Sequence, residues 1–246
     1  MLARLLVLLL ALGAPALGAP SPNLLANGGF ELRQAVDGSA DGWESALPPG
    51  GTGGTDTAIA RSGKASLRLT VPESAPVSWY TAYRAVGPVR RGAFTMSAWV
   101  RTRDVEEGTG AYISLNCFNG AGTRLAYFDS PAKVTGTSEW RRLTTTAKIP
   151  DGTSELRAIL CVHGRGTAWF DDAQVEEGEA ATDYQPARAD VEAVAAREAE
   201  ARAAAEWTQA LPARKPGQAR VAVLDERFPA GPSAPSDPAV LAAALS

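Results

Sequence analysis

FTMSAWVR, at residues 94–101, decides the fold class because its side chains alternate along an extended chain. In a strand, every second side chain points to the same face of the sheet. One face of this segment would therefore carry Phe94, Met96, Ala98 and Val100, and the other Thr95, Ser97, Trp99 and Arg101. A half-buried strand is the structure that this pattern favours.

Similar short segments recur on both sides of it, separated by turn residues. They are ASLRLTV at 65–71, residues 77–86, AYISLNCF at 111–118, and residues 123–129, 140–149, 155–163 and 167–176. No helix-period stretch interrupts them. Repeated short strands of this kind predict an antiparallel all-β sandwich.

The residues N-terminal to this region read differently. Residues 23–31 (NLLANGGFE) predict a short apolar strand, and residues 34–57, rich in Gly, Pro, Asp and Ser, predict loops anchored by Trp43. Residues 1–19 have a short basic start, the apolar run 5–12 and then small residues and prolines. This layout predicts a signal peptide and an exported protein, because the apolar run is too short to span a bilayer.

C-terminal to the sandwich, the composition changes twice. Residues 187–210 are packed with Ala, Glu and Arg, which predicts a helical spacer over about 186–211 with Asp190 as its N-cap. Residues 220–225 (RVAVLD) look like a buried parallel strand, and Asp237 and Pro238 open a short helix. One strand and one helix cannot close a core, so we expect 219–246 to be the truncated start of an α/β domain.

The two cysteines, Cys117 and Cys161, are compatible with two readings. An exported protein permits a disulfide, whereas both residues also fall on strands and would suit buried thiols. The net charge of -3 offers no broad basic field and disfavours nucleic acid as a partner. Beyond the N-terminal run, no segment is apolar enough for a membrane span.

Five sequence pieces together resemble a known family. They are NLLANGGFE (23–31) with Trp43 downstream, SGKASLRL (62–69), FTMSAWVRT (94–102), EWRRLTTTAKIP (139–150) and GTAWFDDAQVEEG (166–178). In this order they resemble the jelly-roll carbohydrate-binding modules appended to bacterial cellulases and xylanases, which have a galactose-binding-like fold. The resemblance covers about residues 23–178 and implies a jelly-roll β-sandwich that binds a polysaccharide or glycan.

The same resemblance implies one structural calcium ion at the rim of the sandwich. Transferred to this chain, its ligands would be Glu31, the backbone near Gly63 and Lys64, and Asp171 or Asp172. Calcium takes six to eight oxygen ligands and accepts backbone carbonyls. Without the resemblance, these residues would be read as a surface carboxylate and an acidic strand end.

A sugar-binding surface needs aromatic rings for stacking and polar side chains for hydroxyl groups. Four tryptophans, Trp43, Trp99, Trp140 and Trp169, lie in the framework segments and are expected to pack. The candidate ligand-facing residues are Trp79, Tyr80, Tyr83, Tyr112, Asn116 and Tyr127. Because Tyr80 differs in parity from Trp79 and Tyr83, at least one of these three is expected to lie in the core.

Complete catalytic machinery is not found in the sequence. His163 is the single histidine, no G-x-S-x-G nucleophile elbow exists, and there is no phosphate loop or dinucleotide fingerprint. The acidic pairs 106–107, 171–172 and 176–177 are sequence neighbours, which a strand directs to opposite faces. We therefore expect a secreted, extracellular binding module that is part of a larger polysaccharide-acting hydrolase and directs it to its substrate. The catalytic domain of that hydrolase would lie beyond Ser246. The alternative is a non-catalytic cell-surface glycan or protein interaction module.

Overall fold

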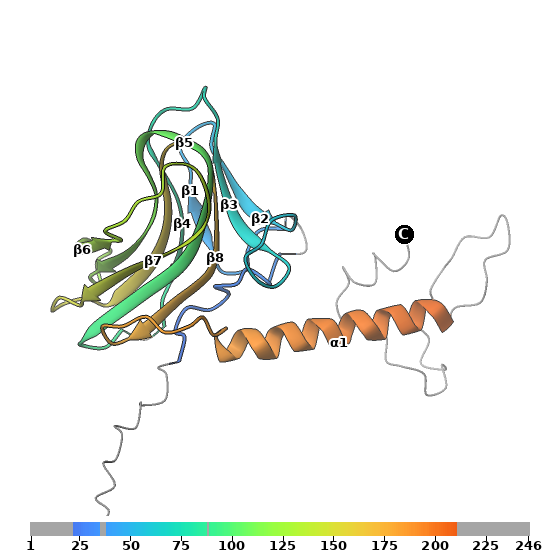
Figure 1. Ribbon diagram of the computed structural model, residues 1–246. Helices are drawn as coiled ribbons and strands as arrows, with labels where there is room; N and C mark the ends of the chain where they lie inside the picture. Colours follow the sequence, from blue (N-terminus) through green and yellow to red (C-terminus); the bar gives the residue numbers. More distant parts are fainter. Residues whose placement is uncertain (1–21, 35–37, 88, 211–246) are drawn as a thin grey trace, which may run out of the picture.

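The computed structural model describes residues 22–34, 38–87 and 89–210, so the predicted signal peptide (1–19) and α/β segment (219–246) lie outside the described residues. The described chain is an all-β jelly-roll sandwich followed by one helix, as predicted (Figure 1). Its strands are β1 (Glu44–Ala46), β2 (Thr52–Asp56), β3 (Ser66–Val71), β4 (Trp79–Ala85), β5 (Ala93–Phe118), β6 (Arg124–Asp129), β7 (Gly136–Lys148) and β8 (Glu155–Glu177).

Two long strands organise the fold. The sequence predicted separate strands at 94–101 and 111–118, and at 155–163 and 167–176, but each pair is one continuous bent strand, β5 and β8. These strands pair antiparallel along nearly their whole length, with register shifts between Arg103 and Gly110. At the bend, Gly110 and Gly164 adopt φ angles of 102° and 136°, which glycine tolerates. Glycines let the strands continue through a corner where alternation alone predicts an interruption.

The bend divides the pairing into two layers. In one layer, β8 residues 166–170 pair with β3, which pairs with β2, while the start of β5 pairs with β7. In the other, β8 residues 157–163 pair with β4, which pairs with β1, while the end of β5 pairs with β6. The folded-over arrangement of these strands is visible in Figure 1.

The hydrophobic core fills the space between the layers. Burying apolar side chains of this size contributes about 1.5–3 kcal/mol each. Fully buried members come from both long strands and from β3, and include Leu69, Met96, Ile113, Leu115, Leu156, Leu160 and Phe170. Met96 belongs to the set Phe94, Met96, Ala98 and Val100 that the sequence predicted on one face of its strand.

The predicted first strand at 23–31 is wrong, because the segment forms turns. Asn27 and Phe30 have φ angles of 50° and 57°, which no strand accommodates. The Asn27 side chain explains the turn: its Nδ2 donates to the carbonyl of Leu32 at 2.7 Å, and its Oδ1 accepts the Leu32 N–H at 3.0 Å. The apolar residues Leu25 and Phe30 are nevertheless completely buried.

The predicted loop at 34–57 is also corrected, since it contains β1 and β2. β2 is mostly Thr and Gly and lacks an apolar pattern of its own, so its strand character comes from pairing with β3. Trp43 anchors this region as expected: its indole Nε1 donates to the Asn27 carbonyl at 2.9 Å, and its ring packs on Phe30.

One helix, α1 (Arg188–Ala210), follows the sandwich. Asp190 was predicted as the N-cap but lies inside the first turn, and its Oδ2 accepts the backbone N–H of Asn27 at 2.6 Å. Further contacts join the helix to the sandwich, including a Lys64–Glu198 ion pair of 3.1 Å and a hydrogen bond from Arg197 to the Arg33 carbonyl. No helix within the described ranges has the length and hydropathy to cross a membrane.

Candidate functional site

Five of the six predicted ligand-facing residues lie on one outward face of the layer formed by β4, β8, β5 and β6. The register pairs Trp79 with His163, Tyr112 with Cys161, and Asn116 with both Arg157 and Tyr127. Directly opposed residues of an antiparallel sheet point to the same side, and so do alternate residues of one strand. We call this surface the aromatic face, defined by Trp79, Tyr83, Tyr112, Asn116, Phe118, Tyr127 and His163.

Trp79 offers an exposed ring that is supported by a second ring. Its side chain is 59% exposed, and one side of the indole stacks on the His163 ring with centroids 4.5 Å apart and planes 16° from parallel. His163 is itself fixed, because its Nδ1 accepts the Thr109 backbone N–H at 3.1 Å. The indole is therefore supported from behind by a ring that is held in place.

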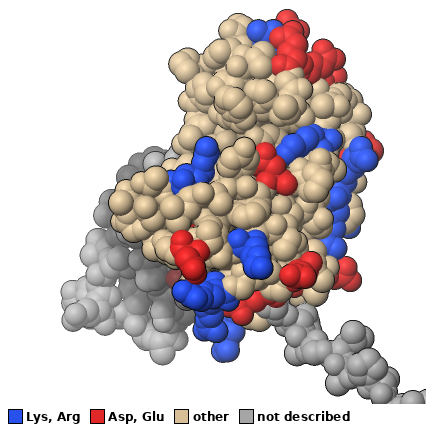
Figure 2. Space-filling model, turned by 90° about the vertical axis from the view of Figure 1, so that its left-hand side faces the viewer, with Lys and Arg blue, Asp and Glu red and all other residues tan. Residues whose placement is uncertain are grey.

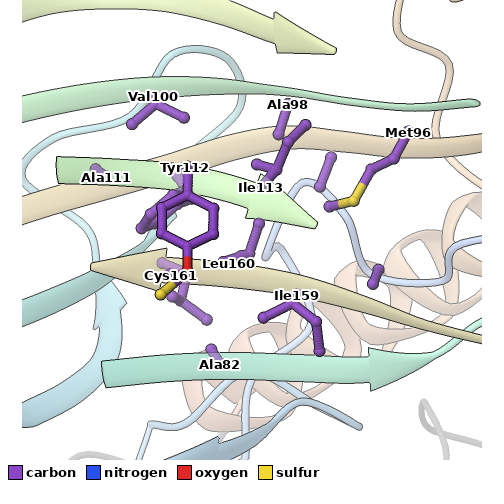
Figure 3. Close-up of a cluster of buried hydrophobic side chains, with 14 of the residues drawn as sticks. Ala82, Met96, Ala98, Val100, Ala111, Tyr112, Ile113, Ile159, Leu160 and Cys161 are labelled. Carbon is purple, nitrogen blue, oxygen red and sulfur yellow. The ribbon is translucent and has the colours of Figure 1, made fainter. Parts of the chain in front are cut away.

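Tyr112 is buried under charged residues at the centre of the aromatic face. The Lys133 ammonium lies 3.8 Å from the Tyr112 ring centroid and 3.5 Å from a carboxylate oxygen of Asp129. Figure 3 shows the Tyr112 hydroxyl directed toward the sulfur of Cys161. Since Tyr112 is 7% exposed, Lys133 and Asp129 rather than the ring are offered to solvent here.

Tyr127 marks the far edge of the face, on the edge strand β6. It is 60% exposed, and the Arg124 guanidinium lies 5.2 Å from its ring centroid. Asn116 lies directly across from it on β5 and accepts a hydrogen bond from the Ser114 hydroxyl. An exposed ring, an amide and a guanidinium thus meet in one place.

Arg157 lies between Tyr83 on β4 and Phe118 at the end of β5. Its guanidinium lies 5.3 Å from the Tyr83 ring centroid and 4.4 Å from that of Phe118, and it is ion-paired with Glu155. The Tyr83 hydroxyl donates to Glu44 at 2.9 Å. Polar and aromatic groups therefore alternate across the face.

Tyr80 does not belong to this surface. It is completely buried, and its hydroxyl donates to the Pro76 carbonyl at 2.8 Å. This fulfils the expectation that one of the three β4 aromatic residues lies in the core. Among the framework tryptophans, Trp43 and Trp169 are buried, while Trp99 and Trp140 are half-buried.

Sequence reasoning missed His163, Phe118 and Lys133 as members or neighbours of the face. The parity of His163 along residues 155–163 matches that of Arg157, but the partner strand that completes the pair with Trp79 cannot be read from one segment. Lys133 lies in the connection after β6 and reaches the face only through the folded chain.

The predicted calcium ligands meet at the 61–65 turn. Glu31 Oε1 accepts the Lys64 and Ala65 N–H groups at 2.7 and 3.1 Å, and a Cβ added to Gly63 would lie 2.2 Å from that oxygen. Asp171 Oδ2 accepts the Arg61 N–H at 2.7 Å, and the Ser62 hydroxyl donates to Asp172 at 2.6 Å.

Two acidic side chains, Asp171 and Asp172, are buried next to this turn. Burial, followed by the neighbouring Asp172 charge, raises the pKa of Asp171 to about 7. Its oxygens accept N–H groups, however, and no described set of three or more His, Cys, Asp or Glu side chains is placed to share a metal ion. Calcium binding at this turn therefore stays a prediction.

Cys117 and Cys161 are buried free thiols. Cys117 pairs with Leu156 and Cys161 with Tyr112, so the two lie five positions apart along neighbouring strands, about 16 Å. A disulfide requires Cα atoms within about 7 Å. Burial raises the pKa of the Cys161 thiol to about 12, which keeps it protonated and unreactive.

Charged side chains and two cavities lie elsewhere on the described chain. On the side of the molecule shown in Figure 2, basic and acidic residues are interspersed among uncharged ones. A cavity of about 410 Å³ lies between residues 31–34 and α1, and another of about 370 Å³ is lined by Tyr184 and Val191. Both are at the helix junction, away from the aromatic face.

No family model matches the chain, and no curated protein matches it. Among solved structures, it is similar to the CBM22-1 xylan-binding domain from Paenibacillus barcinonensis Xyn10C, at 17% identity over 66% of this chain and 98% of that one, with a TM-score of 0.48. It is also similar to TmCBM61 in complex with β-1,4-galactotriose, at 18% identity over 64% and 100% of the chains, with a TM-score of 0.43.

A third similar structure is the enzymatically active domain of bacteriophage CBA120 tailspike protein 4, at 14% identity and a TM-score of 0.48. This chain covers 21% of that domain, and 63% of this chain is matched. At such identities the likeness concerns the fold alone. The strand pairing of the described residues itself defines the class of structure, a jelly-roll β-sandwich.

Proposed function

We propose that the aromatic face binds a glycan and that the described chain is a binding module without a reaction of its own. The single observation that carries this is the exposed Trp79 indole stacked on His163. An indole held flat from behind offers its free side to the apolar C–H face of a sugar at little cost in side-chain entropy.

Polar groups beside the rings support the same proposal. Sugar hydroxyl groups both donate and accept hydrogen bonds, so a binding face needs both kinds of partner. Asn116 supplies an amide, Asp129 and Glu44 supply carboxylates, and Lys133 supplies an ammonium group. A surface of this kind orients a neutral sugar without requiring charge on the ligand.

Each carboxylate of the aromatic face is held by a neighbouring side chain. Asp129 is held by Lys133, Glu155 by Arg157, and Glu44 by the Tyr83 hydroxyl. A general acid in a glycosidase instead needs a position opposite a second carboxylate, across the bond that is cleaved. We therefore assign these groups to hydroxyl recognition.

We further propose that the module is exported and targets a polysaccharide-acting protein to its substrate. Export rests on the layout of residues 1–19, and targeting rests on the effective concentration that tethering provides. A second candidate, an extracellular protein-interaction module, is favoured by the exposed Leu125 and Tyr127 on the edge strand β6.

The test is retention of the intact chain on insoluble xylan, galactan and cellulose, with elution by the matching soluble oligosaccharide. The first two probes follow the ligands named for the similar structures. We expect retention on at least one of them and release by its oligosaccharide. Failure to bind any of a broad polysaccharide panel, with and without calcium, contradicts the glycan proposal.

A further inference from the structure

A second surface lies outward on the other layer of the sandwich, over β3, β5 and β8. Four arginines surround two tryptophans there, and we call this surface the arginine face: Arg61, Arg68, Arg101, Arg103, Trp99 and Trp169. The register places Arg68 opposite Trp169 and Trp169 opposite Arg101. This row contains none of the aromatic-face residues.

The Cα atoms that carry these arginines are closely spaced. Arg68 and Arg101 are two strands apart, about 10 Å, and Arg101 and Arg103 are two residues apart on β5, about 7 Å. Arg61 joins them from the loop before β3, because its guanidinium lies 4.3 Å from the ring centroid of Trp99.

The tryptophans hold the guanidinium groups in place. The Arg103 guanidinium lies 5.1 Å from the ring centroid of Trp169, which is 2% exposed and whose Nε1 donates to Asp56 at 2.9 Å. A guanidinium stacked on an indole keeps its N–H edge free for an anion. The cations are thus ordered before a ligand arrives, which lowers the entropy cost of binding.

The charge on the face is only partly neutralised. Arg68 pairs with Asp56 at 3.1 Å, and Arg101 pairs with the exposed Glu139 at 3.2 Å. Burial raises the pKa of the Asp172 carboxyl, and the Ser62 hydroxyl and the nearby Arg61 charge only partly offset this effect. Asp104 accepts the Thr137 hydroxyl. Within the described chain, no carboxylate lies at ion-pair distance from Arg61 or Arg103.

We infer that the arginine face binds an anionic polysaccharide, through carboxylate or sulfate groups that pair with Arg61 and Arg103. Guanidinium forks match such groups with paired hydrogen bonds. Single-stranded nucleic acid is disfavoured because Trp169 is buried, Trp99 is covered by Arg61 and no free stacking ring is offered to a base.

Native gel electrophoresis of the full chain through polygalacturonate, dextran sulfate or a neutral xylan tests the inference. We expect retardation by an anionic polymer that weakens with salt. The double variant R61Q/R103Q should lose about tenfold in affinity, since it removes the two guanidinium groups that pair with the ligand. A second variant, T70E, places a carboxylate in the row of Thr167 and Arg103 and should weaken retardation without removing an arginine.

The control is R91Q/R188Q, which removes two exposed charges away from the arginine face. The retardation of R91Q/R188Q by the anionic polymer should stay close to that of the wild-type chain. The retardation of W79A should be unchanged. Comparing polygalacturonate with dextran sulfate shows whether carboxylate or sulfate is preferred. The inference is overturned if neither polymer retards the chain, if the control loses as much as R61Q/R103Q, or if single-stranded DNA is bound as tightly.

Discussion

Trp79 and His163 form a stacked pair across β4 and β8, with ring centroids 4.5 Å apart. The two residues are 84 positions apart in sequence (163 − 79) and meet because the register places them directly opposite each other. The pair turns an exposed indole into a fixed platform at one end of the aromatic face. Neither residue alone carries this property.

The first prediction concerns the support that His163 provides. Replacing His163 with Gln keeps an acceptor for the Thr109 N–H but removes the ring behind the indole. An aromatic pair contributes about 0.5–1.5 kcal/mol, so H163Q should bind glycan about fivefold more weakly at nearly unchanged thermal stability. Calorimetric titration and a melting curve on the same sample measure both. Unchanged affinity would mean that the stack is not used in binding.

The corner glycines should be required for stability. A Cβ on Gly164 would lie 2.4 Å from the Glu106 carbonyl, and the residue has a φ of 136°. G164A should therefore lower the free energy of unfolding by about 3 kcal/mol or more, measured by urea denaturation.

Gly54 is a matched control for Gly164. It also lies in a strand, but a Cβ there meets no heavy atom within 4 Å. G54A should change the free energy of unfolding by no more than about 0.5 kcal/mol. Equal effects of the two substitutions would contradict the role assigned to the corner.

The fold was predictable where side-chain pattern alone determines the structure. Alternation in 94–101 and 155–163 identified strands whose inner faces are buried, and parity separated Tyr80 from Trp79. The bend was not predictable, because glycine and turn residues signal a strand end as readily as a corner. The turn at Asn27 depends on its hydrogen bonds to Leu32, which join a residue inside the predicted 23–31 strand to one just after it.

The site was predicted in composition but not in arrangement. Five of the predicted residues share one face, whereas the residues that contact their rings come from segments distant in sequence. His163 reaches Trp79 through strand pairing, and Lys133 reaches Tyr112 from a loop. Such contacts depend on register, which a single sequence does not determine.

Asp56 should make the sandwich sensitive to acid. Burial opposes its ionisation, yet hydrogen bonds from Trp169 and Ala58 and the charge of Arg68 lower the pKa of Asp56 below its usual 3.8. The carboxylate therefore stabilises the fold above the unfolded-state pKa, and this stabilisation is lost as pH falls through the lower folded-state value.

We expect D56N to lose about 1–3 kcal/mol of unfolding free energy at pH 7 and to show a shallower decline between about pH 5 and pH 2. Urea midpoints over this pH range provide the measurement. D151N, at an exposed ion pair with Arg91, should behave as wild type. An unchanged acid profile in D56N would rule out this role for Asp56.

Calcium should stabilise the chain through the carboxylates at the 61–65 turn. Adding about 5 mM calcium, but not magnesium, to metal-free protein should raise the melting temperature, since calcium accepts irregular oxygen sets and magnesium requires an octahedron. The increase should be lost in E31Q and D172N and kept in E179Q. A melting temperature independent of calcium in the wild-type chain would contradict the predicted site.

Glycan affinity of W79A, compared with V77A, is the most direct test of the central claim. Both residues are exposed and lie near the start of β4, but Val77 precedes the strand and offers no ring. On whichever polysaccharide retains the wild-type chain, W79A should lose about 2 kcal/mol, or about thirtyfold in affinity, while V77A stays within about twofold. Equal affinities of W79A and the wild-type chain would contradict the account.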